Sequence, residues 1–318
     1  MIPPEWILSA SHRISPYIVH TPVIYDPELQ VYLKWENQQH TGSFKLRGAL
    51  NKVLSLKPWE IEKGVVAASA GNHGAGLAFA CKQAGGKALI FVPDSAPLIK
   101  LNKIRALGAE VALIAGGYTA TEDYAIQYAK EHHQTFISPY NDAQVIAGQG
   151  TLALETIRDL SQETVKAWVV PVGGGGLISG IGAALESYRD TSIPSPLLIG
   201  VQSEASPYME QIYYTGVQDQ VVELPSIADG LSGAVEPHSI TIPLVKKYVD
   251  QILLVSEDEI HQAIRYAWDC YHQVIEGSAA VVLAAILSAK IIHRPALLVI
   301  SGGNIDPQLH QRIVDREI

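Results

Sequence analysis

The stretch Ala167-Trp-Val-Val-Pro-Val-Gly-Gly-Gly-Gly-Leu177 decides which fold the rest of the chain can adopt. Its first half is a short apolar run of the kind that forms a buried strand. From Leu177 to Leu185, apolar side chains recur at helical spacing, which predicts an amphipathic helix. The strand and the helix are joined by four consecutive glycines: Gly173, Gly174, Gly175 and Gly176.

This glycine junction predicts an anion site. Glycine lets the backbone N–H groups turn inward where a Cβ would clash, and the first turn of a helix adds N–H groups without partners. Such a cradle suits a phosphate. No lysine follows the glycines, so the nucleoside-triphosphate loop pattern does not match. A dinucleotide fingerprint matches only in part, through Glu204 after the next strand. A tight turn without a ligand is the alternative.

Composition excludes several classes of protein. The chain has 318 residues, 47% hydrophobic residues, 17% charged residues and a formal net charge of −9, which indicates a compact globular protein with two lobes. The absence of a basic run argues against nucleic acid as a partner. The apolar run at 279–287 is too short to span a bilayer, so no membrane is expected. Cys81 and Cys270 lie in apolar helical stretches, which suggests a reducing compartment and a cytoplasmic protein.

Strand-like and helix-like segments alternate from residue 64 onward, in two series. The apolar runs expected to be strands are 65–69, 88–92, 111–115 and 135–137 in the first series, and 167–172, 197–202, 252–255 and 296–300 in the second. Nearly continuous apolar strands separated by helices are typical of parallel sheets covered on both faces. The sequence therefore predicts an α/β protein with two doubly wound parallel-sheet lobes.

Short polar segments follow several of these expected strands: Ser69-Ala-Gly-Asn-His73, Gly173 to Gly176, Gln202 to Glu204 and Ser301-Gly-Gly-Asn304. In open α/β sheets, ligands bind at the carboxyl ends of the strands. We therefore expect one shared cleft between the lobes, although each segment taken alone could be an ordinary turn.

A reactive group is expected at Lys45, within a segment from Lys34 to Ala49 that is dense in polar side chains. A lone lysine is usually a solvated surface charge. Beside a phosphate cradle, however, a lysine amine can bind the aldehyde of pyridoxal phosphate, which carries both the aldehyde and the phosphate.

Five segments resemble, in order, the motifs of fold-type II pyridoxal-phosphate enzymes: 41–49 (TGSFKLRGA), 69–73 (SAGNH), 145–151 (VIAGQGT), 172–177 (VGGGGL) and 301–304 (SGGN). The resemblance covers nearly the whole chain and is strongest to the serine/threonine dehydratase (threonine ammonia-lyase) branch, related to serine racemase. It implies a fold like that of the tryptophan synthase β subunit, with the cofactor in the cleft. A large cofactor-binding domain would comprise 1–54 and 144–318, and a small domain 55–143.

The resemblance also implies roles for individual residues. Lys45 would carry the cofactor as a Schiff base and remove the substrate Cα proton. The other cofactor contacts would be Phe44 on the pyridine ring, Asn72 on the phenolic oxygen, Ser301 at the ring nitrogen, and Gly173, Gly174, Gly175, Gly176 and Leu177 around the phosphate. The substrate carboxylate would be held by Ser69, Ala70, Gly71, Asn72 and His73.

The implied reaction is β-elimination of L-threonine or L-serine to a 2-oxo acid and ammonia. Related racemases have a serine where this chain has Ala70, and alanine cannot deliver a proton, so racemisation is disfavoured. Glu276-Gly-Ser-Ala-Ala280 departs from the usual dehydratase pattern and leaves the substrate open. The alternatives are a dehydratase of another β-hydroxy amino acid such as hydroxyaspartate, a serine racemase or, from another class, a nicotinamide-dependent oxidoreductase.

Other residues are expected to have secondary roles. Glu204 and Glu210 resemble a divalent-cation site of several relatives, which would suit Mg²⁺ or Ca²⁺; a helix cap and a solvated face are the alternative. Segment 228–231 resembles a loop on the substrate side, and an ordinary turn is the alternative. Arg47 is expected to pair with a carboxylate. The partner is expected to be a small amino-acid substrate, and the resemblance together with the frequency of symmetric oligomers favours a homodimer.

Overall fold

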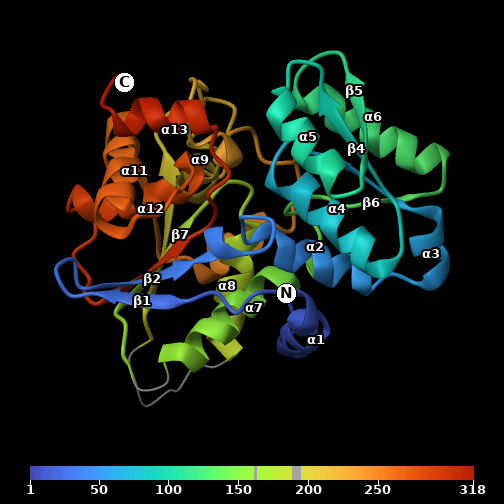
Figure 1. Ribbon diagram of the computed structural model, residues 1–318. Helices are drawn as coiled ribbons and strands as arrows, with labels where there is room; N and C mark the ends of the chain where they lie inside the picture. The colour runs from blue at the N-terminus through green and yellow to red at the C-terminus, as the bar shows by residue number, and fades with distance from the viewer. Residues whose placement is uncertain (161–162, 188–194) are drawn as a thin grey trace.

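Two lobes lie side by side in the computed structural model, which describes residues 1–160, 163–187 and 195–318 (Figure 1). One lobe is built on a six-stranded sheet and the other on a four-stranded sheet. The strands of the large lobe come from residues 23–35 and 167–300, and those of the small lobe from residues 65–136. This confirms the two parallel-sheet lobes expected from the alternating pattern. The exact boundaries at 54/55 and 143/144 stay a prediction.

The large sheet has the strand order β1-β2-β10-β7-β8-β9. Its strands are β1 (Val23–Asp26), β2 (Val31–Trp35), β7 (Ala167–Pro171), β8 (Leu197–Ser203), β9 (Gln251–Val255) and β10 (Ala296–Ile300). All neighbours are parallel except β1 and β2, which form an antiparallel hairpin. The register places Leu298 beside Leu33 and Val169.

Both faces of the large sheet are covered because successive side chains of a strand point to opposite faces. Trp168 and Val170 of β7 belong to one apolar core, whereas Ala167 and Val169 belong to another. Helices α7 and α8 pack on the first face and helices α11 and α12 on the second. This arrangement explains why β7 and β10 are apolar at every position rather than at alternate positions.

The small sheet has the order β5-β4-β3-β6 and is parallel throughout. Its strands are β3 (Val65–Ala68), β4 (Ala88–Pro93), β5 (Glu110–Ile114) and β6 (Thr135–Phe136). Helices α2, α4 and α5 contribute to the core on one face, and α6 covers the other.

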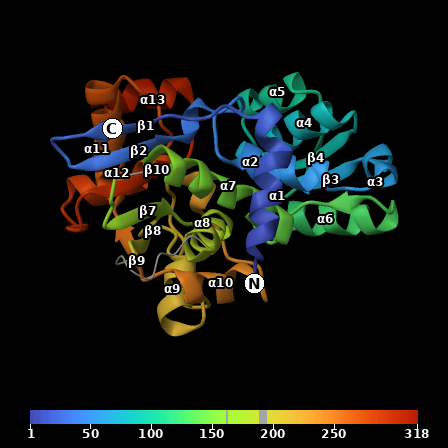
Figure 2. The ribbon, with the colours of Figure 1, turned by 90° about the horizontal axis from the view of Figure 1, so that it is seen from below.

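The helices, in chain order, are α1 (Pro4–Ile14), α2 (Lys45–Leu54), α3 (Pro58–Lys63), α4 (Asn72–Ala84), α5 (Leu98–Ala106), α6 (Tyr118–Glu131), α7 (Ala143–Leu160), α8 (Gly176–Ser187), α9 (Tyr208–Thr215), α10 (Thr241–Tyr248), α11 (Glu257–Tyr271), α12 (Gly277–Leu287) and α13 (Pro307–Val314). Short 3₁₀ turns are η1 (Ser15–Tyr17), η2 (Glu36–Gln38) and η3 (Asp229–Leu231). Helix α1 lies along the junction of the two lobes and contacts α7 and α2 (Figure 2). Within the described ranges, no helix has the length and apolarity needed to cross a bilayer.

The hairpin of β1 and β2 was not predicted from the sequence. Its second strand includes Lys34, a residue type that is rarely buried, so the segment was interpreted as a polar region. In the structure Lys34 is fully buried, because its amine donates to the carboxylate of Glu155 at 2.6 Å and to the carbonyl of Thr21 at 2.6 Å. The large sheet consequently has an antiparallel edge that the alternating pattern did not indicate.

Candidate active site

Lys45 is the first residue of α2, and it is held against two other motif segments. The backbone N–H of Phe44 donates to the carbonyl of Ser301 at 3.0 Å, and Ser43 forms a bridge with Gly302. The Lys45 amine donates to the carbonyl of Pro139 at 3.0 Å. Burial lowers the pKa of Lys45 to about 8, and a nearby carboxylate only partly opposes this effect. The neutral amine, which is the reactive form, is therefore accessible at a mildly alkaline pH.

The glycine loop and the Lys45 amine both contact the segment Pro139–Tyr140. A Cβ added to Gly174 would lie 2.4 Å from ring atoms of Tyr140, and one added to Gly176 would lie 2.9 Å from the Tyr140 Cβ. Gly175 has a φ of +85°, in the left-handed region that favours glycine. Because Tyr140 follows Pro139 in the chain, the loop and the Lys45 amine contact neighbouring residues of one segment.

The loop itself fits a phosphate. No protein acceptor is recorded for the amide N–H of any residue from Gly173 to Leu177 within the described part of the chain. Gly175, Gly176 and Leu177 are nonetheless buried. Buried N–H groups are rarely left unpaired, so this cradle is suited to a bound anion. The Thr241 hydroxyl donates to the carbonyl of Gly174 at 2.7 Å and holds the loop from outside.

The segment from Ser69 to His73 connects β3 to the start of α4, which begins at Asn72. The N–H of Gly71 donates to the Ser69 hydroxyl at 3.2 Å, which closes the turn. Nε2 of His73 donates to the carbonyl of Ile137 at 2.9 Å. Burial, together with the positive charge of Lys45, lowers the pKa of His73 to about 3, so its ring is neutral. The free N–H groups in the first turn of α4 can therefore bind a carboxylate.

Asn72 is part of a buried hydrogen-bond network centred on Glu276. Asn72 Nδ2 donates to Glu276 Oε1 at 2.7 Å, and the backbone N–H of Asn304 donates to Glu276 Oε2 at 3.2 Å. Asn304 Nδ2 in turn donates to Asn72 Oδ1 at 2.5 Å. Burial and the neighbouring charge of Asp229 raise the pKa of Glu276 to about 7. The network fixes the Asn72 amide and leaves one of its N–H bonds for a ligand.

The lysine, the glycine loop, the 69–73 loop and the 301–304 loop are thus brought together, and known proteins share this arrangement. A model of the family described as "Pyridoxal-phosphate dependent enzyme" matches residues 14–302. The chain belongs to this family. The residues present fit its cofactor, because an amine with a lowered pKa and an unpaired N–H cradle lie at one place.

Individual relatives support the same family. The L-threonine ammonia-lyase of Thermotoga maritima is 41% identical, over 99% of this chain and 79% of its own length. The processed form of threonine deaminase isoform 2 from Solanum lycopersicum has a TM-score of 0.88 at 29% identity, covering 98% of this chain and 92% of that one. Serine racemase from Dictyostelium discoideum has a TM-score of 0.86 at 36% identity, covering 96% of this chain and 99% of that one. The expected fold-type II architecture is confirmed, and pyridoxal phosphate is favoured over a nicotinamide cofactor.

Sequence reasoning did not identify Glu276 or Tyr140 as site residues of this pyridoxal-phosphate enzyme. Glu276 was noted only for its departure from a family pattern, and it precedes an apolar helix where a carboxylate is usually a cap. Tyr140 carries no local signal, since its role arises from contact with glycines distant in sequence. By contrast, segment 228–231 does line the site, because a Cβ on Gly173 would lie 3.0 Å from the Leu231 Cα.

The expectation that Arg47 pairs with a carboxylate is confirmed. Its guanidinium contacts Glu36 at 2.8 Å and Glu155 at 2.9 Å. Arg47 and Glu36 are both fully buried, and Lys34 shares the Glu155 carboxylate. This charged cluster lies beneath the first turn of α2 and therefore supports the helix that carries Lys45.

The divalent-cation site expected at Glu204 and Glu210 would use carboxylates from the end of β8 and the start of α9. Glu204 is exposed at the end of β8, and its N–H donates to the carbonyl of Val255 at 2.9 Å. Glu210 lies in the first turn of α9, where burial raises its pKa. Among the residues that the structure describes, no three His, Cys, Asp or Glu side chains gather as a metal site would require. A Mg²⁺ or Ca²⁺ site at Glu204 and Glu210 stays a prediction.

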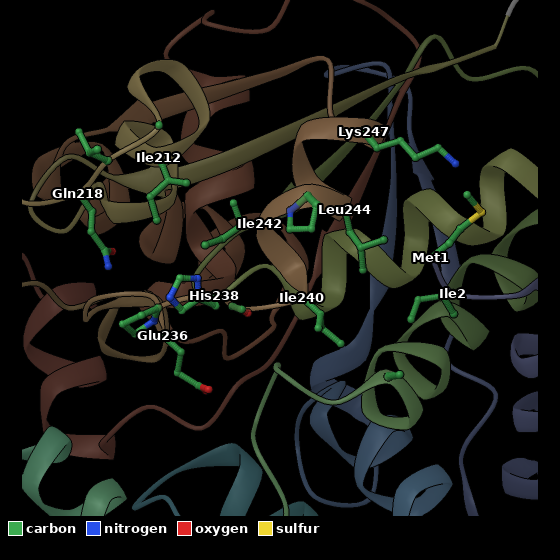
Figure 3. Close-up of a pocket in the computed structure, with 16 residues that line it drawn as sticks. Met1, Ile2, Ile212, Gln218, Glu236, His238, Ile240, Ile242, Leu244 and Lys247 are labelled. Atoms are coloured by element: carbon green, nitrogen blue, oxygen red, sulfur yellow. The ribbon is translucent and has the colours of Figure 1, made fainter.

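A separate cavity of about 930 Å³ opens between α9, α10 and the N-terminal residues (Figure 3). Its wall includes Ile2, Ile212, Leu244 and the segment Glu236–Ile240, and none of the predicted site residues lines it. The same segment contacts the active site, because the N–H of Glu236 donates to the hydroxyl of Tyr140 at 2.9 Å. The cavity is therefore distinct from the cofactor cleft but shares a wall segment with it.

Proposed function

We propose that this enzyme is an ammonia-lyase that uses pyridoxal phosphate to eliminate water from L-threonine or L-serine, which yields a 2-oxo acid and ammonia. The observation that carries the proposal is the position of the Lys45 amine, 3.0 Å from the carbonyl of Pro139, whose neighbour Tyr140 packs on the glycine cradle. The names of relatives such as the L-threonine ammonia-lyase of Thermotoga maritima support the substrate class.

Bound pyridoxal phosphate supplies an aldehyde that captures the substrate amine and a ring that withdraws electrons from Cα. The N–H groups from Gly173 to Leu177 hold the phosphate, and the loop from Ser69 to His73 orients the substrate carboxylate. The Lys45 amine would hold the cofactor and would accept the Cα proton as a general base. Its lowered pKa, about 8, makes the neutral amine more accessible than in an ordinary lysine.

The residue at the ring nitrogen favours elimination over transamination. Ser301 is the residue that the resemblance assigns to this contact, and it is buried next to Phe44. A hydroxyl is a much weaker proton source than a carboxylate, so the ring stays largely neutral and withdraws electrons less strongly. A less stabilised carbanion expels its β-substituent promptly, which suits a β-hydroxy amino acid.

Serine racemisation is the second function to consider, because a serine racemase has a similar structure. Ala70 has no proton to deliver to the opposite face of Cα, so elimination should dominate. The purified enzyme should release ammonia from L-serine with negligible D-serine, measured by chiral chromatography. D-serine formed as fast as ammonia would contradict this assignment.

The decisive experiment combines a substrate panel with a Lys45 variant. The holoenzyme should form ammonia and a 2-oxo acid from L-threonine and L-serine, and it should show the visible absorption of lysine-bound cofactor. Lys45→Ala should lose the absorption band and at least about 1000-fold of kcat while keeping its circular dichroism spectrum. A colourless wild-type protein that ignores added pyridoxal phosphate would rule out the proposal.

We also propose that the enzyme acts as a homodimer in the cytoplasm. The dimer is suggested by the resemblance and by the frequency of two-fold oligomers. The reducing compartment is suggested by two free cysteines, Cys81 and Cys270, which form no disulfide in the described structure. Light scattering of the purified holoenzyme would measure the subunit number directly.

A further inference from the structure

Glu122 of the small lobe stands beside the loop expected to hold the substrate carboxylate. It lies on α6, one turn after Tyr118, whose hydroxyl donates to Glu122 Oε1 at 3.1 Å. The same hydroxyl lies 3.4 Å from the carbonyl of Ala68, the residue directly before Ser69. Glu122 is therefore held near the start of the 69–73 loop.

Glu236 of the large lobe lies beside Tyr140. Its Oε1 accepts from the Ser138 hydroxyl at 3.1 Å, and its Oε2 accepts from Asn141 Nδ2 at 2.6 Å. Its N–H donates to the Tyr140 hydroxyl at 2.9 Å. In Figure 3 the Glu236 carboxylate points out of the cavity, toward the ribbon of the small lobe. Glu236 thus faces the cleft from the side of the glycine loop.

The two carboxylates influence each other across the cleft. Burial raises the pKa of Glu122 to about 7, and the charge of Glu236 adds to this rise. Burial is likewise the main reason that the pKa of Tyr140 is raised. Glu122 and Glu236 therefore lie near the two ends of the site: Glu122 by way of Tyr118 at the start of the 69–73 loop, and Glu236 by way of Tyr140 at the glycine loop.

Neither carboxylate is paired with a cation in the part of the chain that the structure describes: no ion pair there involves Glu122 or Glu236. Two lysines of the small lobe have other partners: Lys100 pairs with Asp229, and Lys103 donates to Asn304 Oδ1. Both glutamates therefore add negative charge without a paired countercharge.

The substrate side chain would extend toward the carboxylates of Glu122 and Glu236. In pyridoxal phosphate the aldehyde carbon lies between the phenolic oxygen and the phosphate arm. The phenolic side is expected at Asn72, in the same loop that holds the substrate carboxylate, and the phosphate side is expected at the glycine loop. With the carboxylate held by the 69–73 loop, the Cβ substituent would lie on the side of Tyr140, which packs on Gly174 and Gly176.

We propose that Glu122 and Glu236 are specificity-determining residues that reject amino acids carrying a carboxylate on Cβ. This inference rests on the proposed function and narrows its substrate class to β-hydroxy amino acids with an uncharged Cβ substituent, such as L-threonine and L-serine. A β-carboxylate would be brought, with partial loss of its hydration, next to two like charges without a countercharge. Discrimination through such repulsion is an established way to exclude a competing substrate.

The first test compares L-threonine with L-threo-3-hydroxyaspartate, which has a carboxylate in place of the methyl group. At pH 8.5 or above, well above the pKa of Glu122, the wild-type holoenzyme should favour L-threonine by about 100-fold or more in kcat/KM. Glu122→Gln and Glu236→Gln should each reduce this ratio by about 10-fold, since each removes one repelling charge. Gln keeps an acceptor for Tyr118 at position 122 and one for Asn141 at position 236.

Asp123→Asn serves as the matched control. Asp123 is the neighbour of Glu122 on α6, but it is exposed, so the variant removes the same net charge without changing the cleft. It should leave the substrate ratio unchanged. A ratio that shifts equally in Asp123→Asn would mean that overall charge, rather than the cleft, decides the preference.

The second test needs only the wild-type enzyme, and therefore holds even if a variant fails to fold. L-asparagine and L-aspartate have nearly the same shape and differ in the charge of the Cβ substituent. Both should inhibit L-threonine turnover competitively, and the inhibition constant of L-asparagine should be lower than that of L-aspartate by about 10-fold or more. Equal or stronger inhibition by L-aspartate would overturn the inference.

The outcomes separate the two proposals. An enzyme that releases ammonia from no β-hydroxy amino acid refutes the proposed function. An enzyme that turns over L-threonine and L-threo-3-hydroxyaspartate equally well retains the proposed function but refutes the role of the two glutamates. Unchanged ratios in both folded variants would refute that role as well.

Discussion

At position 276 a carboxylate is buried where most proteins would place an apolar side chain or a paired charge. Its two oxygens accept from Asn72 and from the N–H of Asn304, which partly replaces the lost hydration. Burial still dominates, and the pKa of Glu276 rises to about 7. A neutral carboxylic acid can donate a hydrogen bond, so the protonation state of Glu276 decides how the Asn72 amide is held.

This shift predicts a pH dependence of stability. Because the folded state holds the Glu276 proton up to about pH 7, whereas an ordinary carboxyl titrates near 4.5, the folded state binds more protons between these values. The free energy of unfolding should therefore fall as pH rises through that window, by up to about 3 kcal/mol from this residue. Glu276→Gln should remove this contribution, which urea titrations of both apoproteins from pH 4.5 to 8 would measure. A difference between the two proteins that is flat over this range would contradict the shift.

At the scale of elements, the junction of β7 with α8 is shaped by contacts that only glycine permits. The loop passes so close to Tyr140 that the ring occupies the place of a Cβ at Gly174. The β7 strand and the α8 helix are both recognisable in the sequence, but the tyrosine that covers their junction comes from the segment after β6. The phosphate cradle is therefore made by two connections between elements rather than by one.

Gly174→Ala adds only a methyl group, but it should weaken cofactor binding strongly. The added methyl would lie 2.4 Å from the Tyr140 ring and would push the ring or the loop aside. We expect the Kd for pyridoxal phosphate, measured by absorbance titration of the apoenzyme, to rise about 10-fold or more. Gly117→Ala is the matched control, since its φ is −80° and its added Cβ meets nothing within 4 Å. Equal cofactor affinity in both variants would show that the close contact is unimportant.

For the whole molecule, a buried charge cluster ties the β1–β2 hairpin to α2 and α7. Arg47 contacts Glu36 and Glu155, and Lys34 from the hairpin shares Glu155. These residues come from four separate elements, β2, η2, α2 and α7, at the place where the chain leaves the large sheet for the small lobe. The position of Lys45 therefore depends on packing that spans much of the molecule.

Arg47→Met should destabilise the protein by about 3–5 kcal/mol, because the fully buried Glu36 would lose its charged partner and Glu155 would keep only Lys34. Lys247→Met provides a comparison, since it breaks a pair with Glu186 in which both side chains are partly exposed, at 37% and 48%. That exposed pair should contribute about 0–1 kcal/mol. Denaturant unfolding of both variants measures the difference, and similar losses of stability in the two would contradict the role assigned to the cluster.

The α/β class, the two series of strands and the positions of the motif loops followed from the sequence alone, because apolar periodicity and glycine placement act locally. The same local signals, together with the family resemblance, led to the prediction that Lys45 and the glycine loop bind one cofactor. Only the tertiary structure revealed Tyr140 against the glycines, Glu276 beside Asn72, and Glu122 within the electrostatic influence of Glu236. These residues carry no periodic signal, since their roles come from contacts between segments distant along the chain, and from the burial that such contacts impose.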